Sequence, residues 1–247
     1  MKSEMEAPFP RPLSGAVVDK VPPALVPARA PIKGRLITLE PQNADKHTDE
    51  LYQAGHNTKQ ALAIWDYMAY GPWPDPDNYK QTLRAQSSSF DPIFFTLVDN
   101  ASGTACGQAS FLDINAQNGV IEIGHIWFSP KLQRTAAGTE ALYLMLCLAM
   151  DDLGYRRMQW RCNSLNEKSR GAARRLGFRF EGIFYNHLIF KGKNRDTAWY
   201  SILDNEWPEV RNIIEQWLQP SNFSTEGVPK TSLTELMTSR KPGTRSV

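Results

Sequence analysis

The sequence predicts an α+β fold, a mixed and mostly antiparallel sheet of six to seven strands with helices on both faces. Three observations support this prediction. Strand-like and helix-like segments are interleaved along one continuous stretch, residues 33–219. An apolar strand at 120–128 is followed by a loop of small residues and a long apolar helix. The G-x-G-x-x-G and G-x-x-x-x-G-K-[ST] motifs are absent, which argues against dehydrogenase and P-loop folds.

Periodicity and turn residues define the first half of this domain. Alternation predicts a strand at 34–39, and Asn43 and Asp45 are helix-capping residues for a helix to about residue 55. A second apolar helical face covers 58–68, and a Gly- and Pro-rich stretch at 71–76 ends it. Asp77 is expected to cap a short helix to about residue 87. Turn residues then separate three strands in a meander, at 93–98, 104–113 and 120–128.

The second half alternates helix and strand before a closing hairpin. A long apolar helix is expected at 139–153, where Gly154 ends it, and a strand at 157–162. The next helix, 167–176, ends at Gly177. A hairpin of 178–190 and 195–202 and a last helix at 207–218 complete the domain.

The two ends of the chain differ from this domain in composition. Residues 1–32 hold seven prolines without helical or strand periodicity, which indicates an extended arm, either disordered or draped over the domain. Residues 220–247 are rich in Ser, Thr, Pro, Lys and Arg and are expected to form a flexible tail, with room for a short helix at 233–237.

Composition excludes several classes of function. The chain has 247 residues and a net charge of only +2, which gives no general case for nucleic acid or an anionic membrane as partner. No apolar run reaches the roughly 18 residues of a membrane span, and acidic residues and prolines interrupt the N-terminal segment. Cys106, Cys147 and Cys162 lack metal-ligand spacing and are expected as buried thiols. We therefore expect a cytoplasmic protein without a bound metal.

The loop at 133–138 suggests a ligand. It is rich in small residues and lies where the N-terminus of the following helix exposes unpaired N–H groups. Such a helix end is a site for a phosphate or pyrophosphate, and small side chains let the ligand approach the backbone. A cofactor that contains a nucleotide is therefore expected here.

Over residues 33–206 the chain resembles the GNAT superfamily of acyl-CoA-dependent N-acetyltransferases, in particular its RimJ/RimL-like branch. The superfamily loop Gln/Arg-x-x-Gly-x-Gly/Ala appears as Gln133-x-x-Ala136-x-Gly138. The other matching motifs are Thr139-Glu140-Ala141, Asn166-Glu167-Lys168-Ser169, Arg175-Leu176-Gly177-Phe178, Glu181-Gly182, Asn194-Arg195-Asp196 and Glu206-Trp207.

The resemblance implies a GNAT-type sheet whose central parallel strands, 120–128 and 157–162, splay apart to admit the pantetheine arm of acetyl-CoA. Lys131 and Arg134 are expected to add positive charge near the phosphates. Ala136 replaces the first loop glycine, which is harmless if it lies in the first helical turn and strained if the position needs a positive φ. The implied cofactor-binding residues are Ile126, Trp127, Phe128, Gln133, Arg134, Thr135, Ala136, Ala137, Gly138, Thr139, Asn166 and Ser169.

Acetyl transfer to an amine needs a group that accepts a proton. Glu122 interrupts an apolar strand, and some superfamily members place a catalytic Glu at this position; the alternative is a solvated residue on a half-exposed sheet. His125 is a second catalytic candidate, and a structural His is its alternative. Three residues apart on a strand, the two side chains are expected on opposite faces unless a bulge intervenes.

The proton donor is less clear from the sequence. The superfamily's usual Tyr acid is missing, because Ala173 occupies its position. Ser169 is the substitute that RimL-like relatives suggest, and a hydroxyl in the first turn of a helix is its alternative. The basic residues around it, Lys168, Arg170 and Arg174-Arg175, could face the 3′-phosphate of CoA or solvent.

Trp73, Tyr185 and Asp196 are candidates for binding the acceptor. Aromatic residues at 65–79 lie where the family builds its acceptor site, although packing between helices and sheet also explains them. The resemblance implies as acceptor a small-molecule amine or a peptide N-terminus, and allows a homodimer. The alternative function is a non-catalytic acyl-CoA-binding module that acts through protein partners.

Overall fold

The computed structural model describes residues 23–240, whose strands form one eight-stranded sheet in the order β1-β2-β3-β4-β5-β6-β8-β7. Neighbouring strands are antiparallel except β5 and β6, so the sheet is mixed as predicted. The two-residue β1 raises the strand number above the expected six to seven. The strands are β1 (Ile32–Lys33), β2 (Ile37–Pro41), β3 (Ile93–Asp99), β4 (Ala105–Asn115), β5 (Val120–Phe128), β6 (Arg157–Asn163), β7 (Arg179–Phe190) and β8 (Lys193–Leu203).

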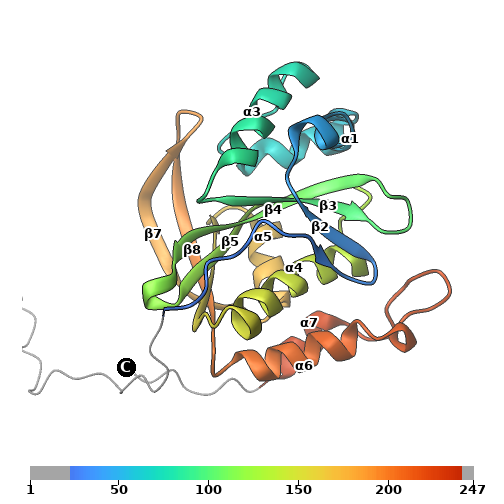
Figure 1. Ribbon diagram of the computed structural model, residues 1–247. Helices are drawn as coiled ribbons and strands as arrows, with labels where there is room; N and C mark the ends of the chain where they lie inside the picture. The colour runs from blue at the N-terminus through green and yellow to red at the C-terminus, as the bar shows by residue number, and fades with distance from the viewer. Residues whose placement is uncertain (1–22, 241–247) are drawn as a thin grey trace, which may run out of the picture.

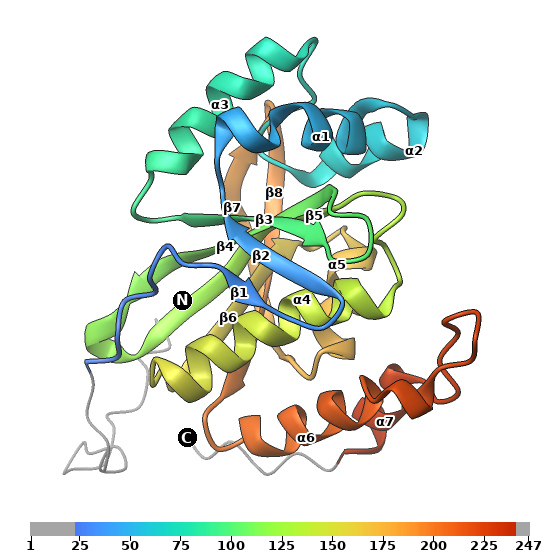
Figure 2. The ribbon, with the colours of Figure 1, turned by 45° about the vertical axis from the view of Figure 1, so that its right-hand side comes forward.

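Helices cover both faces of the sheet (Figure 1). The first three α-helices lie on one face, and the remaining four lie on the other, as the turned view in Figure 2 also shows. The α-helices are α1 (Ala44–His56), α2 (Lys59–Leu62), α3 (Pro76–Ser88), α4 (Ala136–Cys147), α5 (Glu167–Arg175), α6 (Trp207–Trp217) and α7 (Leu233–Ser239). Short 3-10 segments are η1 (Ala63–Tyr67), η2 (Ala116–Asn118) and η4 (Pro220–Asn222), and a π-helical turn, η3 (Leu148–Asp152), extends α4.

Local side-chain caps set where the helices begin. Asn43 accepts a hydrogen bond from the backbone N–H of Lys46 and starts α1, as expected. The cap of α3 is Asp75 and not Asp77, because Pro76 already occupies the first helical position. The cap of α4 is Thr135, so this helix starts three residues earlier than its apolar periodicity indicated. The predicted helix at 58–68 is divided into α2 and η1.

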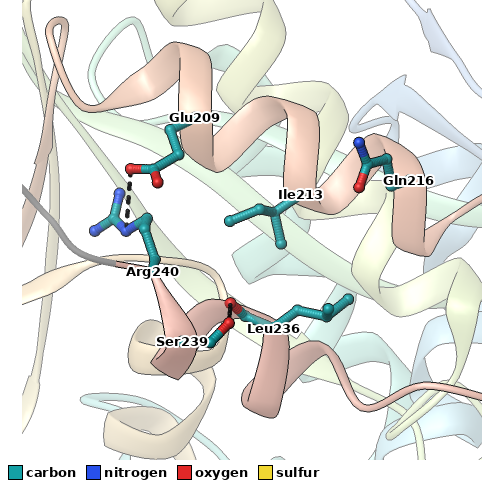
Figure 3. Close-up of a pocket in the computed structure, with 6 residues that line it drawn as sticks. All are labelled: Glu209, Ile213, Gln216, Leu236, Ser239 and Arg240. Atoms are coloured by element: carbon teal, nitrogen blue, oxygen red, sulfur yellow. Dashed lines mark hydrogen bonds and ion pairs between the residues drawn. The ribbon is translucent and has the colours of Figure 1, made fainter.

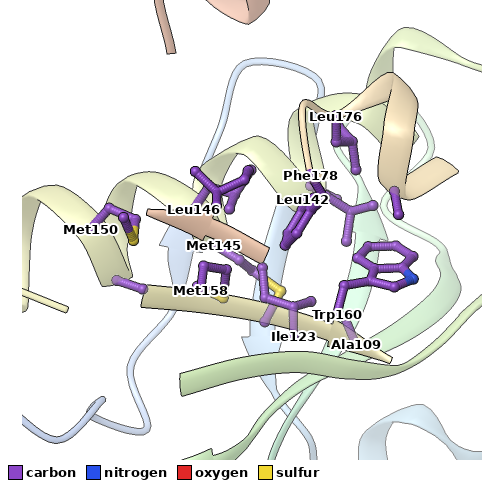
Figure 4. Packing of buried hydrophobic residues seen from close by; sticks show 14 of the residues in the cluster. Ala109, Ile123, Leu142, Met145, Leu146, Met150, Met158, Trp160, Leu176 and Phe178 are labelled. Atoms are coloured by element: carbon purple, nitrogen blue, oxygen red, sulfur yellow. The ribbon is translucent and has the colours of Figure 1, made fainter. Parts of the chain in front are cut away.

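The larger core lies between the sheet and the helices α4 to α7, and Figure 4 shows its part around α4 and β6. Met145 and Leu146 of α4 are fully buried against this side of the sheet, near Met158 of β6. A smaller aromatic cluster on the other face packs Trp65 and Tyr79 against Trp127 of β5. Trp65 and Tyr79, which belong to the expected acceptor region, are therefore packing residues.

The C-terminal segment up to residue 240 is packed on the domain, which corrects the expectation of a flexible tail from residue 220. Leu233 and Met237 of α7 are buried in the larger core. A pocket of about 410 Å³ lies between α6 and α7, lined by Ile213, Leu236 and polar residues around them (Figure 3). No candidate site residue lines it.

At the N-terminal end, residues 23–31 are draped over the domain. The N–H groups of Ala24 and Leu25 donate to Ala116 and Leu153. The expected arm at residues 1–22 and the end of the tail at 241–247 lie outside the described residues. No helix within residues 23–240 has both the length and the hydrophobicity of a bilayer span.

Candidate active site

A gap opens where β5 and β6 separate. The two parallel strands pair only from Val120 to Glu122, opposite Arg157 to Gln159. Beyond Glu122, β5 keeps its pairing with β4, while β6 continues beside β8. The edge of β5 that faces β6 therefore has no strand beside it from Gly124 to Phe128, within residues 23–240. Its backbone groups are available to an extended ligand, as the resemblance implied.

The N-terminus of α4 lies directly beyond this edge. Thr135 accepts from the N–H of Gly138 at 3.0 Å and donates its own hydroxyl to the carbonyl of Leu132 at 2.8 Å. The N–H groups of Arg134, Ala136 and Ala137 have no acceptor among the described residues. Since the helix dipole adds positive potential here, the end of α4 can bind an anion such as a pyrophosphate.

Ala136 lies in the first helical turn and not at a position with a positive φ. It is the first helical residue of α4, directly after the cap, so its alanine side chain is unstrained. The positive φ of this loop, 62°, falls instead on Arg134. Small size matters most at Gly138, where an added Cβ would lie 2.9 Å from the carbonyl oxygen of Leu132. Gln133 closes the loop by donating to the carbonyl of Phe128 at 2.9 Å.

Arg175 of α5 brings a positive charge to this helix end. Its guanidinium donates to the hydroxyl of Thr139 at 2.8 Å and stacks on the ring of Trp217 at 5.0 Å. It forms no ion pair with a described carboxylate, and burial lowers its pKa. The neighbouring Arg174 is more exposed and lies 3.7 Å from Glu167. Of the basic residues around Ser169, Arg175 is thus the one in contact with α4.

Glu122 is buried on the sheet face opposite the larger core, at the point where the gap begins. It is 3% exposed and forms an ion pair with Arg161 of β6, which also pairs with Asp113. Burial raises the pKa of Glu122 to about 7; Arg161 opposes this shift and Asp113 reinforces it. The alternative of a solvated residue is therefore wrong. A carboxylate with this pKa can accept a proton near neutral pH.

His125 lies on the same face as Glu122, which corrects the expectation of opposite faces. Gly124 pairs with Ser110 and Trp127 with Gln108, so β5 holds one residue more than β4 between them. This bulge, with His125 at a φ of 49°, reverses the alternation. The His125 ring packs 5.1 Å from Phe94, the cross-strand partner of Ser110 on that face.

The protonation of His125 follows from its surroundings. Burial, together with the nearby Arg161 and Arg195, lowers its pKa to about 4. Tyr70 lies 2.9 Å from Nδ1 and accepts a hydrogen bond from Gln108. When the Tyr70 hydroxyl donates to Nδ1, the ring proton lies on Nε2. A neutral imidazole of this kind is a weak base at neutral pH.

Comparison with known proteins identifies the family. The family model described as "Acetyltransferase (GNAT) domain" matches residues 37–179. A crystal structure of a GCN5-related N-acetyltransferase from Brucella melitensis is 42% identical, covers 89% of this chain and 99% of its own, and has a TM-score of 0.86. This chain belongs to the GNAT acetyltransferases. The resemblance found in the sequence is thus confirmed, and so is an acetyltransferase activity in place of a non-catalytic module.

Two further GNAT relatives are similar over most of their length. A structure from Chromobacterium violaceum ATCC 12472, described as "a probable acetyltransferases (GNAT family)", is 35% identical with a TM-score of 0.73, and covers 82% of this chain and 100% of its own. The Bacillus subtilis (strain 168) protein described as "Putative ribosomal N-acetyltransferase YdaF" is 28% identical over 68% of this chain and 90% of its own.

Asn166 and Ser169 of this GNAT acetyltransferase have structural roles at the start of α5. The side chain of Asn166 caps the helix by accepting from the N–H of Ser169 at 3.1 Å. The Ser169 hydroxyl accepts from the indole N–H of Trp160 in β6 at 3.0 Å. That contact places Ser169 beside β6, where its hydroxyl also forms a hydrogen bond with the side chain of Cys162.

Two of the three acceptor-binding candidates lie in the β7–β8 hairpin, and the third lies in the aromatic cluster. Trp73 packs in the aromatic cluster, 4.7 Å from Tyr79 between ring centroids. Tyr185 is 75% exposed on β7. Asp196 accepts from the N–H of Asn186 and the amide of Asn194, which lower its pKa, so its carboxylate is engaged within the hairpin. Tyr185 and Asp196 are therefore neighbours on the β7–β8 hairpin, since Asp196 binds the residue next to Tyr185, whereas Trp73 lies in the aromatic cluster.

Sequence reasoning missed Arg161 and Tyr70 as parts of the Glu122 and His125 environment. Arg161 of β6 pairs with Trp199 of β8, and both lie on the face of the sheet opposite the larger core. The alternation of residues along 157–162 would have shown this position. The contact of Tyr70 with His125 had no sequence signal, because it depends on the bulge and on a loop 55 residues away.

Proposed function

We propose that this chain is an acetyl-CoA-dependent N-acetyltransferase in which a primary amine attacks the thioester directly. The half-open β5–β6 pair, which leads to an α4 N-terminus with free N–H groups, is the observation that supports this most strongly. When bound, acetyl-CoA supplies an acetyl group on a thioester, which a neutral amine can attack without an acylated enzyme.

Two parts of this site would each bind one part of acetyl-CoA: the N-terminus of α4 and the exposed edge of β5. The free N–H groups of Arg134, Ala136 and Ala137, together with Arg175, would bind the pyrophosphate. The backbone of Ile126 to Phe128 would hold the pantetheine arm, with Asn166 on the opposite side of the gap. Trp127 would contribute only its backbone, because its side chain is buried in the aromatic cluster.

Glu122 is the proposed base. As the amine nitrogen forms its bond to the carbonyl carbon, Glu122 takes the proton that the nitrogen releases, directly or through a water. His125, neutral and fixed by Tyr70, offers its Nε2–H as a hydrogen-bond donor. Ser169 is proposed to stabilise the departing sulfur by a hydrogen bond from its hydroxyl, which Trp160 orients by donating to the oxygen, and the thiolate then takes its proton from solvent.

The acceptor is a small-molecule amine or a protein N-terminus. The description of the B. subtilis relative favours a ribosomal protein, which would place the reaction in the cytoplasm. The test combines titration calorimetry with CoA and thiol release from acetyl-CoA over a panel of amines and peptides. Heat on CoA binding and amine-dependent thiol release are expected. A folded protein that gives no heat with CoA would contradict the proposal.

A further inference from the structure

Resting on this proposed function, we propose that the acceptor of this acetyltransferase carries an anionic group close to its amine, and that Arg195 of β8 binds that group. The acceptor would be an amino acid or a peptide with an acidic group near its N-terminus. A polycationic amine would be excluded.

Arg195 is a half-buried cation without a polar partner. No described carboxylate lies within ion-pairing distance of it, and no described residue accepts a hydrogen bond from it. Its Nε is buried without a partner, and the guanidinium rests on the ring of Phe190 at 4.5 Å. A desolvated guanidinium without a counter-charge is unfavourable for folding, so its presence indicates a ligand that supplies one.

Arg195 lies on the face of the sheet that also carries Glu122 and His125. Residues 195, 197 and 199 of β8 share one face, and Trp199 pairs with Arg161 on β6. Arg195 lies close enough to interact electrostatically with Arg161 and Glu122. The indole N–H of Trp199, on the same face, is a second buried donor without an acceptor. Two unsatisfied donors on this face fit a carboxylate or phosphate better than an ammonium group.

The local charges agree with this assignment. Arg161 meets two carboxylates, Glu122 and Asp113, whereas Arg195 meets none. The phosphates of CoA do not explain Arg195, because α4 packs on the face of the sheet that carries Ala198 and Tyr200, opposite the face of Arg195. The unpaired charge is therefore available to the acceptor.

The test compares matched acceptors in the wild type and in Arg195→Met, which keeps an apolar stem. The panel pairs free amino acids with their amides, and Ser-Asp peptides with Ser-Lys peptides, and includes spermidine. We expect kcat/KM about tenfold or more higher for the anionic member of each pair, as for a charged hydrogen bond. In Arg195→Met this ratio should fall to near one, mainly through KM, and Arg195→Lys should restore part of it.

Lys193→Gln is the matched control, since it removes an exposed positive charge two residues away on the same strand. It should keep the wild-type preference. The melting temperature of Arg195→Met should not fall, which separates ligand binding from a structural role. The amino-acid pairs and the peptide pairs of the acceptor panel distinguish amino acids from peptides as the source of the anion.

Three results would overturn the inference: equal or better turnover of the uncharged members, a preference for spermidine, or a preference that survives in Arg195→Met. Turnover of no panel member, with heat on CoA titration intact, also rejects it while leaving the CoA site standing. Absence of heat with CoA rejects the proposed function itself.

Discussion

The hydroxyl of Tyr70 lies 2.9 Å from Nδ1 of His125, and the two rings stack with their centroids 5.6 Å apart. The contact joins the loop after η1 to the bulge of β5 and fixes the orientation of the imidazole. Tyr70→Phe removes this hydrogen bond and should lower kcat/KM by about three- to tenfold, the value of one hydrogen bond. Steady-state kinetics measure it. Tyr79→Phe is the control, because the buried Tyr79 hydroxyl has no partner and its loss should leave the rate unchanged.

Glu122 should govern the pH dependence of the reaction. With its pKa raised to about 7, it is protonated and inactive as a base below that pH, so kcat/KM should rise through a midpoint near 7. Glu122→Gln should lose about 100-fold or more in kcat. Asp113→Asn removes a negative charge that raises the pKa of Glu122 and should move the midpoint down. An unchanged pH profile in Glu122→Gln would assign the base elsewhere.

At the N-terminus of α4, CoA binding should be sensitive to a substitution of Gly138 and insensitive to one of Ala136. Gly138→Ala places a methyl group against the carbonyl of Leu132 and the ring of Phe128, so the helix end must move. We expect CoA affinity to fall by about tenfold or more in titration calorimetry. Ala136→Gly should keep the affinity within about twofold, since Ala136 is unstrained. Equal effects of the two changes would argue against this site.

Arg175 should contribute to CoA binding through charge. Arg175→Met keeps packing on Trp217 but removes the guanidinium beside Thr139, and CoA affinity should fall by about three- to tenfold. The loss should shrink at high salt, because screening weakens the wild-type interaction. Arg174→Met, one residue away and more exposed, is the matched control and should bind CoA as the wild type does.

The docked α7 should contribute to stability. Leu233→Ala removes a buried side chain from the larger core and should lower the free energy of unfolding by about 2–5 kcal/mol. Urea unfolding measures this difference. Val228→Ala, at a 60% exposed residue of the same segment, should change it by less than about 0.5 kcal/mol. A neutral Leu233→Ala would show that α7 is only loosely attached.

The sequence predicted the order and type of nearly all elements, because each depends on local periodicity and capping. It predicted the anion site at α4 for the same reason, since a strand, a loop of small residues and a helix adjoin along the chain. Boundaries moved where a cap lay outside the apolar pattern, as at Thr135 and Asp75. The docking of α7 was missed, since its three apolar residues in a polar segment do not reveal the surface they cover.

The sequence by itself determined the family, the sheet with its separating parallel strands, and Glu122 as the candidate base. Only the tertiary structure decided the environment of that base. One extra residue in β5 turned His125 to the face of Glu122, and pairing of β6 with β8 brought Arg161 and Arg195 there. Charge, burial and hydrogen bonding depend on distances between residues far apart in the chain, and no local pattern of residue types specifies those distances.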